Sequence, residues 1–243
     1  MKQVDAADGR ASARVPLDVW HRAEVEFITN AAHELQSPLA AILSAVEVLQ
    51  AGAKDNADRD RFIEHIERET RRLDRITRAL LTLARAQTGV EPPRSELIDL
   101  KPLLEAIAER CEPAPGVELV VECPPELALV GNHELLEQAI TNVVRNSVKY
   151  TEQGTIKLVG TPVDGRVLVA VADTGVGIPE EALPRVAERF YRAQASRDGF
   201  GLGLAIVRAA MEVLDGELEI ASKLGYGTTV TMSLPIRALR VTR

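Results

Sequence analysis

The sequence predicts an α+β protein in which a long helical hairpin is followed by an α/β sandwich. Apolar residues recur at helical spacing through most of the first 89 residues, whereas short strand-like runs alternate with helical segments from residue 99 onward. Pro92 and Pro93 stand where the pattern changes, and consecutive prolines end a helix. We therefore expect a flexible leader over 1–15, the hairpin over 16–89, a linker over 90–98 and the α/β domain over 99–238.

The first helix is expected over about residues 17–51, and Gly52 ends it. Its apolar stripe consists of Ile28, Ala31, Leu35, Leu39, Ile42, Val46 and Leu49. At about 100° per residue, His33 falls nearly opposite this stripe. Because a core histidine would lie within the stripe, we predict that His33 faces water, where an imidazole can react. Pro38 removes one backbone donor, so a bend is expected just beyond the histidine.

The second helix follows a turn that offers Asp55, Asn56 and Asp58 as capping residues, and it ends near Gly89. Its apolar positions are Phe62, Ile66, Leu73, Ile76, Leu80 and Leu83. The opposite face alternates acidic and basic side chains, as a solvated surface does. Two helices of this length cannot bury both stripes against each other alone, so we predict a homodimer in which two hairpins form a four-helix bundle.

The α/β domain is expected to contain helices over about 100–111, 133–150 and 202–215. Strands are expected over 117–122, 128–130, 155–163, 166–172, 217–221 and 228–234. Only Asp164 and Gly165 separate the third of these strands from the fourth, which is a strong hairpin signal.

Composition narrows the possible functions. A net charge of −7 and an aromatic content of 3% argue against nucleic-acid binding, which needs a basic face and stacking rings. Cys111 and Cys123 fit neither a metal-ligand spacing nor a disulfide framework, as expected in a reducing cytosol. No apolar run approaches the roughly 18 residues of a membrane helix, and no signal peptide opens the chain. We expect a cytoplasmic protein, either soluble or the cytosolic part of a longer membrane protein.

Three segments of the α/β domain suit a nucleotide. Asn142, Asn146 and Lys149 share one helix face, where amide oxygens can coordinate Mg²⁺ and a lysine can meet phosphate charge; a plain solvated face is the alternative. Asp173 ends a strand before a glycine-rich turn, so its carboxylate can accept a hydrogen bond from an amino group such as that of adenine; an ordinary strand-ending turn is the alternative. The glycine-rich run 199–203 leads into a helix, whose N-terminus favours phosphate.

In this order, the segments closely resemble the sequence boxes of the sensor histidine kinases, whose ATP-binding domain belongs to the gyrase-like superfamily. The resemblance covers about residues 20–235. The phosphoacceptor box is matched by H-E-L-Q-S-P-L at 33–39, the asparagine box by N-V-V-R-N-S-V-K-Y at 142–150, the first glycine box by D-T-G-V-G at 173–177, the phenylalanine box by E-R-F-Y-R at 188–192 and the second glycine box by G-F-G-L-G at 199–203.

The resemblance implies that the α/β domain binds ATP and Mg²⁺ and that the γ-phosphate is transferred to His33. Glu34 would orient the imidazole and take up its proton. Asn146 would hold Mg²⁺, assisted by Asn142, and residues between about 185 and 200 would form a mobile lid. The other implied nucleotide contacts are Lys149 and Arg192 to phosphates, Tyr150 to the nucleoside, Asp173 to the adenine amine, and Gly175, Gly177, Ile178, Gly199, Gly201, Leu202 and Gly203 in the two glycine boxes.

The resemblance also implies that the phosphoryl group passes from His33 to an aspartate in the receiver domain of a response regulator. Gln36 and Ser37 stand where the family commonly has a basic residue and a threonine. Ser37 lies one turn beyond His33 on the same face. We therefore hypothesise that its hydroxyl positions a water and that phosphatase activity toward the phosphorylated partner is retained. Further along this face, small or apolar residues are candidates for docking a regulator helix: Ala41, Ser44 and Val48.

Other functions stay open. A gyrase-like ATPase would carry a glutamate base at the position of Asn142, and asparagine cannot deprotonate water, so the phosphate should await an external nucleophile. A serine-protein kinase of the anti-sigma type would share the ATP site but lack the hairpin bearing His33. A regulatory pseudokinase would act through dimerisation without histidine phosphotransfer. Asn132 and Leu135 replace the more usual Asp and Arg before the asparagine box, and nothing in the sequence explains this.

Overall fold

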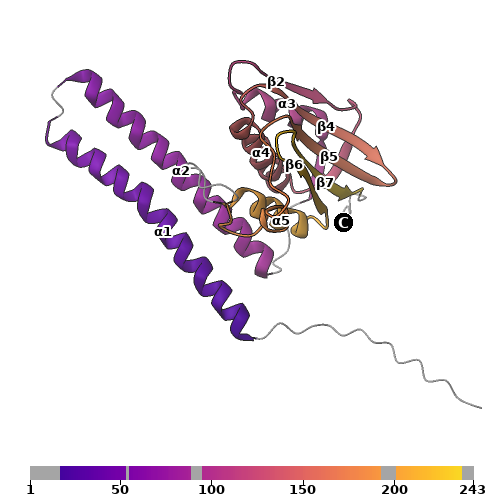
Figure 1. The fold of residues 1–243 in the computed structure, drawn as a ribbon, viewed down its shortest axis with the longest axis horizontal. Helices are drawn as coiled ribbons and strands as arrows, with labels where there is room; N and C mark the ends of the chain where they lie inside the picture. The colour runs from indigo at the N-terminus through magenta and orange to yellow at the C-terminus, as the bar shows by residue number, and fades with distance from the viewer. Residues whose placement is uncertain (1–16, 53–54, 89–94, 193–200, 237–243) are drawn as a thin grey trace, which may run out of the picture.

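A computed structural model describes the chain in four stretches: residues 17–52, 55–88, 95–192 and 201–236. A helical hairpin lies beside an α/β body, and the hairpin comes first in the chain (Figure 1). The predicted fold class, an α+β chain with a hairpin before an α/β sandwich, is therefore confirmed. The predicted leader over 1–15 lies outside the described residues.

The hairpin consists of two antiparallel helices that pack along each other (Figure 1). The Asp55 carboxylate caps the second helix by accepting a hydrogen bond from the Asp58 amide at 2.7 Å. The first helix continues through Pro38. Both helices match the ranges that the apolar periodicity predicts: α1 spans Leu17–Gln50 and α2 spans Asn56–Thr88.

The hairpin covers only part of its own apolar stripe. Ala31, Ala45 and Ile76 are buried between the helices or against the α/β body. In contrast, Ile28 is 60% exposed and Leu39 is 50% exposed, although both were expected in the buried stripe. A single hairpin presents too little facing surface to cover two 100°-wide stripes, and so it leaves large apolar side chains in solvent.

A five-stranded sheet with the order β2-β4-β5-β7-β6 forms the α/β body. Strand β2 runs parallel to β4, and the remaining neighbours are antiparallel. Asp164 and Gly165 both have positive φ, 46° and 77°, as the two-residue hairpin between β4 and β5 requires. The strands are β2 (Val117–Glu122), β4 (Gly154–Val163), β5 (Arg166–Asp173), β6 (Glu217–Lys223) and β7 (Gly227–Pro235).

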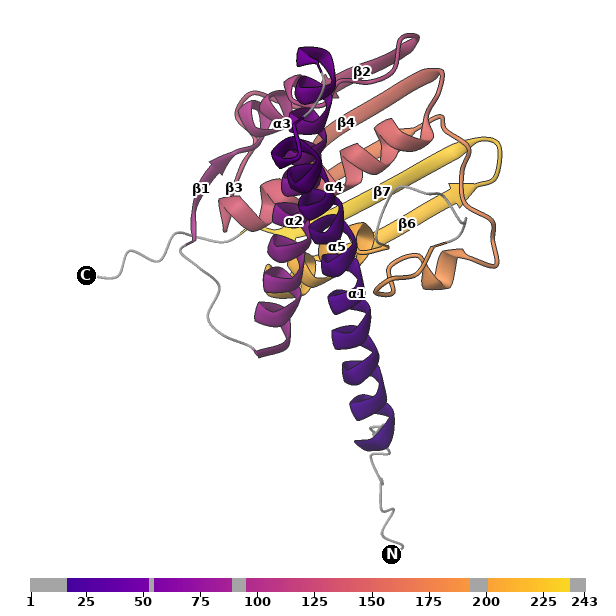
Figure 2. The same ribbon diagram turned by 90° about the vertical axis from the view of Figure 1, so that its left-hand side faces the viewer.

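Three helices cover the face of the sheet that looks toward the hairpin (Figure 2). Along the central strand β5, Val167, Val169 and Val171 are fully buried and alternate with less buried residues, as expected when one face of a sheet is covered. The core therefore lies between the sheet and the helices. These helices are α3 (Leu100–Glu109), α4 (His133–Tyr150) and α5 (Gly203–Val213).

A second, two-stranded sheet corrects the predicted linker over 90–98. Strand β1 (Glu96–Asp99) pairs antiparallel with β3 (Ala128–Gly131), so the α/β body begins at residue 96. The sequence does not predict this strand because the strand is four residues long and buries only Ile98 deeply.

In the described part of the chain, no helix combines the length and the apolar character needed to cross a membrane.

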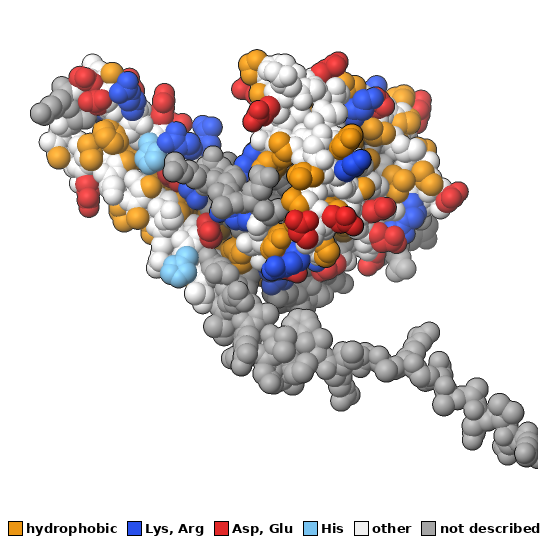
Figure 3. Space-filling model, viewed as in Figure 1, with side chains coloured by type: hydrophobic (Ala, Val, Ile, Leu, Met, Phe, Trp, Pro, Cys, Tyr) orange, Lys and Arg blue, Asp and Glu red, His pale blue; other side chains and the backbone are white. Residues whose placement is uncertain are grey.

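Helix α2 packs on the α/β body against α5, and two side-chain interactions also join it to α4. The Thr82 hydroxyl, which is 5% exposed, donates to the Gln138 side-chain oxygen at 2.8 Å. Arg78 lies 3.9 Å from the Glu134 carboxylate. Basic side chains gather along the edge of the hairpin that faces the α/β body (Figure 3). These contacts place the middle of α2 beside the helices that carry the candidate site.

Candidate nucleotide-binding site

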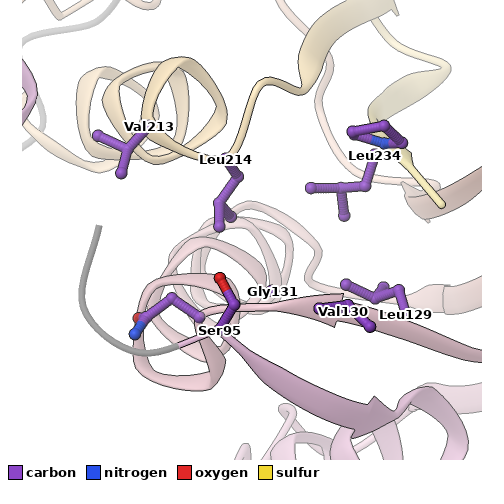
Figure 4. Close-up of a pocket in the computed structure, with 9 residues that line it drawn as sticks. Ser95, Leu129, Val130, Gly131, Val213, Leu214 and Leu234 are labelled. Atoms are coloured by element: carbon purple, nitrogen blue, oxygen red, sulfur yellow. The ribbon is translucent and has the colours of Figure 1, made fainter. Parts of the chain in front are cut away.

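A cavity of about 500 Å³ opens between α4, the end of β5, the start of β7, α5 and helix α2 of the hairpin. This volume lies within the usual range for small-molecule sites. A second pocket, between β3 and the end of α5, holds only about 10 Å³ (Figure 4). That is room for about one water, so the larger cavity is the candidate site.

Asp173 stands in the wall of the large cavity at the end of β5. Its Oδ1 accepts hydrogen bonds from the amides of Gly175 at 3.0 Å and Thr228 at 3.1 Å. Its Oδ2 accepts from the Ser147 hydroxyl at 2.9 Å. Each carboxylate oxygen has two lone pairs, so Oδ2 keeps one for a further donor in the cavity. The Asp173 carboxylate therefore lines the cavity with acceptor capacity to spare.

Sequence reasoning missed Ser147, which is 3% exposed on α4. Its burial places it on the apolar side of the helix, one turn after the buried Val143. A polar residue at an apolar position of a helix was the available signal, because a buried hydroxyl needs a partner.

The glycines of the first glycine box serve the protein's own packing. A Cβ on Gly175 would lie 2.4 Å from the Tyr150 carbonyl oxygen. Gly177 has a φ of +69°, and a Cβ there would lie 2.1 Å from the Lys223 carbonyl oxygen. Glycine is needed at both positions because the backbone approaches other backbone closely around the Asp173 turn.

The predicted polar face of α4 lines the cavity with Asn142, Asn146 and Lys149. The Asn142 side-chain nitrogen is buried and has no hydrogen-bond partner among the described residues. A buried amide without a partner suits a ligand atom that satisfies it. Lys149 Nζ lies 4.8 Å from the centre of the Tyr150 ring. The described residues contain no group of three His, Cys, Asp or Glu that could hold a metal ion.

The start of α5 forms another part of the cavity wall, next to Asn146 of α4. Gly201, Leu202 and Gly203 line it, and no side chain caps the first turn of α5 in the described chain. The amides of such a turn attract anions. A Cβ on Gly203 would lie 3.3 Å from the Asn146 amide nitrogen, so glycine allows α5 to approach α4 closely. Gly199 lies outside the described residues.

Only part of the predicted lid over 185–200 falls within the described residues. The short helix η1 (Leu183–Arg185) begins this region, and Arg192 lines the cavity as an exposed residue. Phe190 has a φ of 62°, and its amide donates to the Gly201 carbonyl at 2.9 Å. That bond ties the phenylalanine box to the second glycine box.

The structure does not bring the predicted phosphoacceptor into the cavity. His33 is exposed on α1, as its position on the helix predicts, with Ser37 also exposed and Glu34 half-buried. None of the described residues of α1 lines the cavity. His33 and Leu73 lie equally far from the turn of the hairpin, so they stand at about the same height. The part of α2 at that height does reach the cavity.

Three further groups of residues lie outside the lining of this cavity. The Asn132 side chain accepts a hydrogen bond from the Leu135 amide at 2.8 Å and so caps α4, which explains a polar residue there. Burial raises the pKa of the Cys111 and Cys123 thiols, and neither lines the cavity. Burial lowers the pKa of Arg189, and the carboxylate of Glu212 opposes that shift.

Comparison with known proteins identifies both parts of the chain. Residues 23–89 match the His Kinase A (phospho-acceptor) domain. Residues 131–238 match the histidine kinase-, DNA gyrase B-, and HSP90-like ATPase. Full-length ShkA in complex with AMPPNP has a similar structure, with a TM-score of 0.65 and 28% identity over 86% of this chain and 45% of that chain. AdeS of Acinetobacter baumannii, with a TM-score of 0.65, covers 85% of this chain and 98% of its own; at 18% identity it shows the fold alone.

The chain is also similar to curated proteins that are named as histidine kinases. The sensor-like histidine kinase SenX3 of Mycobacterium tuberculosis (strain ATCC 25618 / H37Rv) is 34% identical over 218 residues, which cover 86% of this chain and 53% of the relative. The sensor histidine kinase YkoH of Bacillus subtilis (strain 168) is 35% identical over 213 residues, covering 85% of this chain and 46% of the relative. The chain thus spans about half the length of these relatives. With a phosphoacceptor hairpin followed by an ATPase-like domain around a nucleotide-sized cavity, the chain belongs to the sensor histidine kinases.

Proposed function

We propose that this chain is the kinase portion of a two-component sensor, which binds ATP with Mg²⁺ and transfers the γ-phosphate to His33. The observation that carries the proposal is the cavity itself. It joins the Asp173 carboxylate, which can accept a hydrogen bond from the adenine amine, to a helix N-terminus, which favours phosphate, and one of its walls is the hairpin. That wall stands at about the height of His33.

In this proposal, Asp173 accepts a hydrogen bond from the adenine amine and Tyr150 contacts the nucleoside. Lys149 and Arg192 meet phosphate oxygens, together with the amides of Gly201, Leu202 and Gly203. Ile178 and the glycines of the first box support the base end. The Asn146 and Asn142 amides would hold Mg²⁺, which when bound supplies positive charge that offsets the charge of the phosphates.

For the transfer, an imidazole nitrogen of His33 attacks the γ-phosphorus. A nitrogen–phosphorus bond forms, the bond from the γ-phosphorus to the bridging oxygen breaks, and ADP leaves. Glu34 takes up the proton that the imidazole releases. Because His33 lies outside the cavity, the α/β body must move along the hairpin, or it must serve the hairpin of a partner subunit.

The exposed apolar side chains of the hairpin support a homodimer. Ile28, Leu39 and Leu43 on α1 are at least half exposed, and a second hairpin would cover them in a four-helix bundle. Light scattering at micromolar concentration tests this, and a monomeric mass would contradict it. We place the reaction in the cytosol, where ATP and reduced thiols are found.

The phosphoryl group of His33 is proposed to pass to an aspartate of a response-regulator receiver domain. Val48, which is 42% exposed, extends the surface that would dock the regulator. Normal phosphotransfer by Val48→Asp would move the docking surface elsewhere. The Ser37 hydroxyl is proposed to position the water that dephosphorylates the regulator, and unchanged dephosphorylation by Ser37→Ala would exclude that role.

Incubation with Mg-ATP labelled at the γ-phosphate tests the main reaction. The protein should acquire an acid-labile, alkali-stable label, which both His33→Ala and Asp173→Asn should lose. The first variant removes the nucleophile and should still bind ATP, whereas the second should fail to bind it. ATP hydrolysis without any protein-bound label would favour the gyrase-like ATPase instead.

A further inference from the structure

One wall of the nucleotide cavity comes from the hairpin. Arg68, Glu69, Arg72 and Ile76 of α2 line the cavity together with residues of the α/β body. Ile76 is 1% exposed, so the docked helix closes this side tightly. The hydrogen bond between Thr82 and Gln138 holds α2 in that position.

This wall lies beside α5, whose N-terminus is the proposed phosphate site. Within the α/β body, α2 packs mainly against α5. Helix α5 begins at Gly203, which lines the cavity, whereas Asp173 lines it from the end of strand β5. We therefore expect a side chain of α2 that enters the cavity to lie closer to the phosphates than to the base.

The charged residues of the wall form an ordered cluster around a buried carboxylate. Glu69 is 7% exposed, with one oxygen 3.8 Å from Arg68 Nε and the other 3.4 Å from Arg72 Nη1. A buried carboxylate needs such partners, and Arg72 Nη1 donates a hydrogen bond to Glu69 Oε2. The Arg72 side chain is 30% exposed and that of Arg68 is 67% exposed. Arg72 is therefore the more shielded cation, and its interaction with a phosphate is screened less.

Charge and geometry at this end favour an anion. Arg145, Lys149 and Arg192 also line the cavity, and among the described lining residues only Glu69 and Asp173 oppose them. A guanidinium group has five N–H donors, so an arginine can keep its carboxylate partner on one edge and bind a phosphate on another.

We propose that Arg72, oriented by Glu69, is a nucleotide-binding residue that the hairpin supplies to the phosphates of ATP. The inference rests on the proposed function, because it assumes that ATP occupies this cavity. It adds a coupling: phosphate affinity depends on whether the α/β body is docked on α2. By reciprocity, bound phosphates strengthen that docking.

Titration of the whole chain with ATP and AMP tests the proposal. Arg72→Ala should raise the Kd for ATP about tenfold, as expected for a lost charged hydrogen bond, and should leave the Kd for AMP nearly unchanged. Arg71→Ala is the matched control. Arg71 is the next residue on α2, pairs with Glu67 at 3.3 Å and lies outside the cavity lining. Its loss should change neither Kd.

Two further variants separate phosphate binding from packing. Arg72→Lys keeps the charge and should recover part of the ATP affinity. Thr82→Val removes the hydrogen bond that docks α2 and should weaken ATP binding more than AMP binding, although Thr82 lies outside the cavity lining. Equal losses for ATP and AMP in Arg72→Ala, or ATP affinity equal to that of Arg71→Ala, would overturn the inference. A wild-type chain that binds no ATP would overturn the proposed function itself.

Discussion

Replacing Ser147 with alanine should weaken ATP binding through the base. The Ser147 hydroxyl donates to Asp173 Oδ2 at 2.9 Å in a place that is 3% exposed to solvent. A hydrogen bond to a charged group contributes about 1.5–3 kcal/mol to the folded state. Asp173 Oδ1 keeps its hydrogen bonds to the amides of Gly175 and Thr228, so the carboxylate stays in place. Only Oδ2 loses a hydrogen-bond donor. We expect about 1 kcal/mol of this to appear in binding, roughly fivefold in the Kd for ATP.

Isothermal titration with ATP, ADP and inosine triphosphate measures this effect. Inosine triphosphate carries an oxygen where ATP carries the adenine amine, so its Kd should not change in Ser147→Ala. ATP and ADP should weaken equally, because the lost contact lies at the base. Ser233→Ala is the control: the Ser233 hydroxyl accepts from Arg166 Nε at 2.6 Å on the same sheet, and Ser233 does not line the cavity. If Ser147→Ala loses stability but binds ATP like Ser233→Ala, the Ser147 hydroxyl serves folding alone.

Three other substitutions or conditions test stability. Asn132→Ala removes the cap of α4 and should cost about 1 kcal/mol, measured as a lower Tm; an unchanged Tm would show that the Leu135 amide finds another acceptor. Gly177→Ala should cost about 3 kcal/mol or more, because its Cβ would meet the Lys223 carbonyl oxygen at 2.1 Å with φ at +69°; wild-type denaturant stability would refute this. Burial raises the pKa of Cys111, so the unfolded chain loses this proton first and stability should fall as pH rises above about 8.5. Denaturant unfolding of Cys111→Ala should show a smaller fall.

Local patterns in the sequence predict most of the fold. Helix α4 matches its predicted range because apolar spacing and the capping Asn132 act within a few residues of each other. The hairpin between β4 and β5 follows from Asp164 and Gly165, whose positive φ values need only their own two residues. Strand β1 is not predicted because its partner β3 lies about thirty residues away, and no local periodicity in the sequence indicates the pairing.

Parts of the candidate site can likewise be predicted from local sequence, and other parts cannot. The face bearing Asn142 and Asn146 can be predicted from a single helix, and so can the exposure of His33. The wall formed by Arg72 cannot, because it depends on how the hairpin and the α/β body dock. From the sequence, that charged face of α2 indicates only a solvated surface. Ser147 needed the tertiary contact with Asp173 before its role became visible.

The backbone bond between Val176 and Tyr150 has a kinetic consequence. The Val176 amide donates to the Tyr150 carbonyl at 3.1 Å and ties the turn after Asp173 to the end of α4. The base end of the cavity is therefore one preformed unit, whereas α2 belongs to a different part of the chain. The association rate constant of ATP should therefore be set by this preformed unit, and changes in the hairpin should not alter it. How long the nucleotide stays bound should depend on α2, so that a signal acting on the hairpin changes the residence time of ATP.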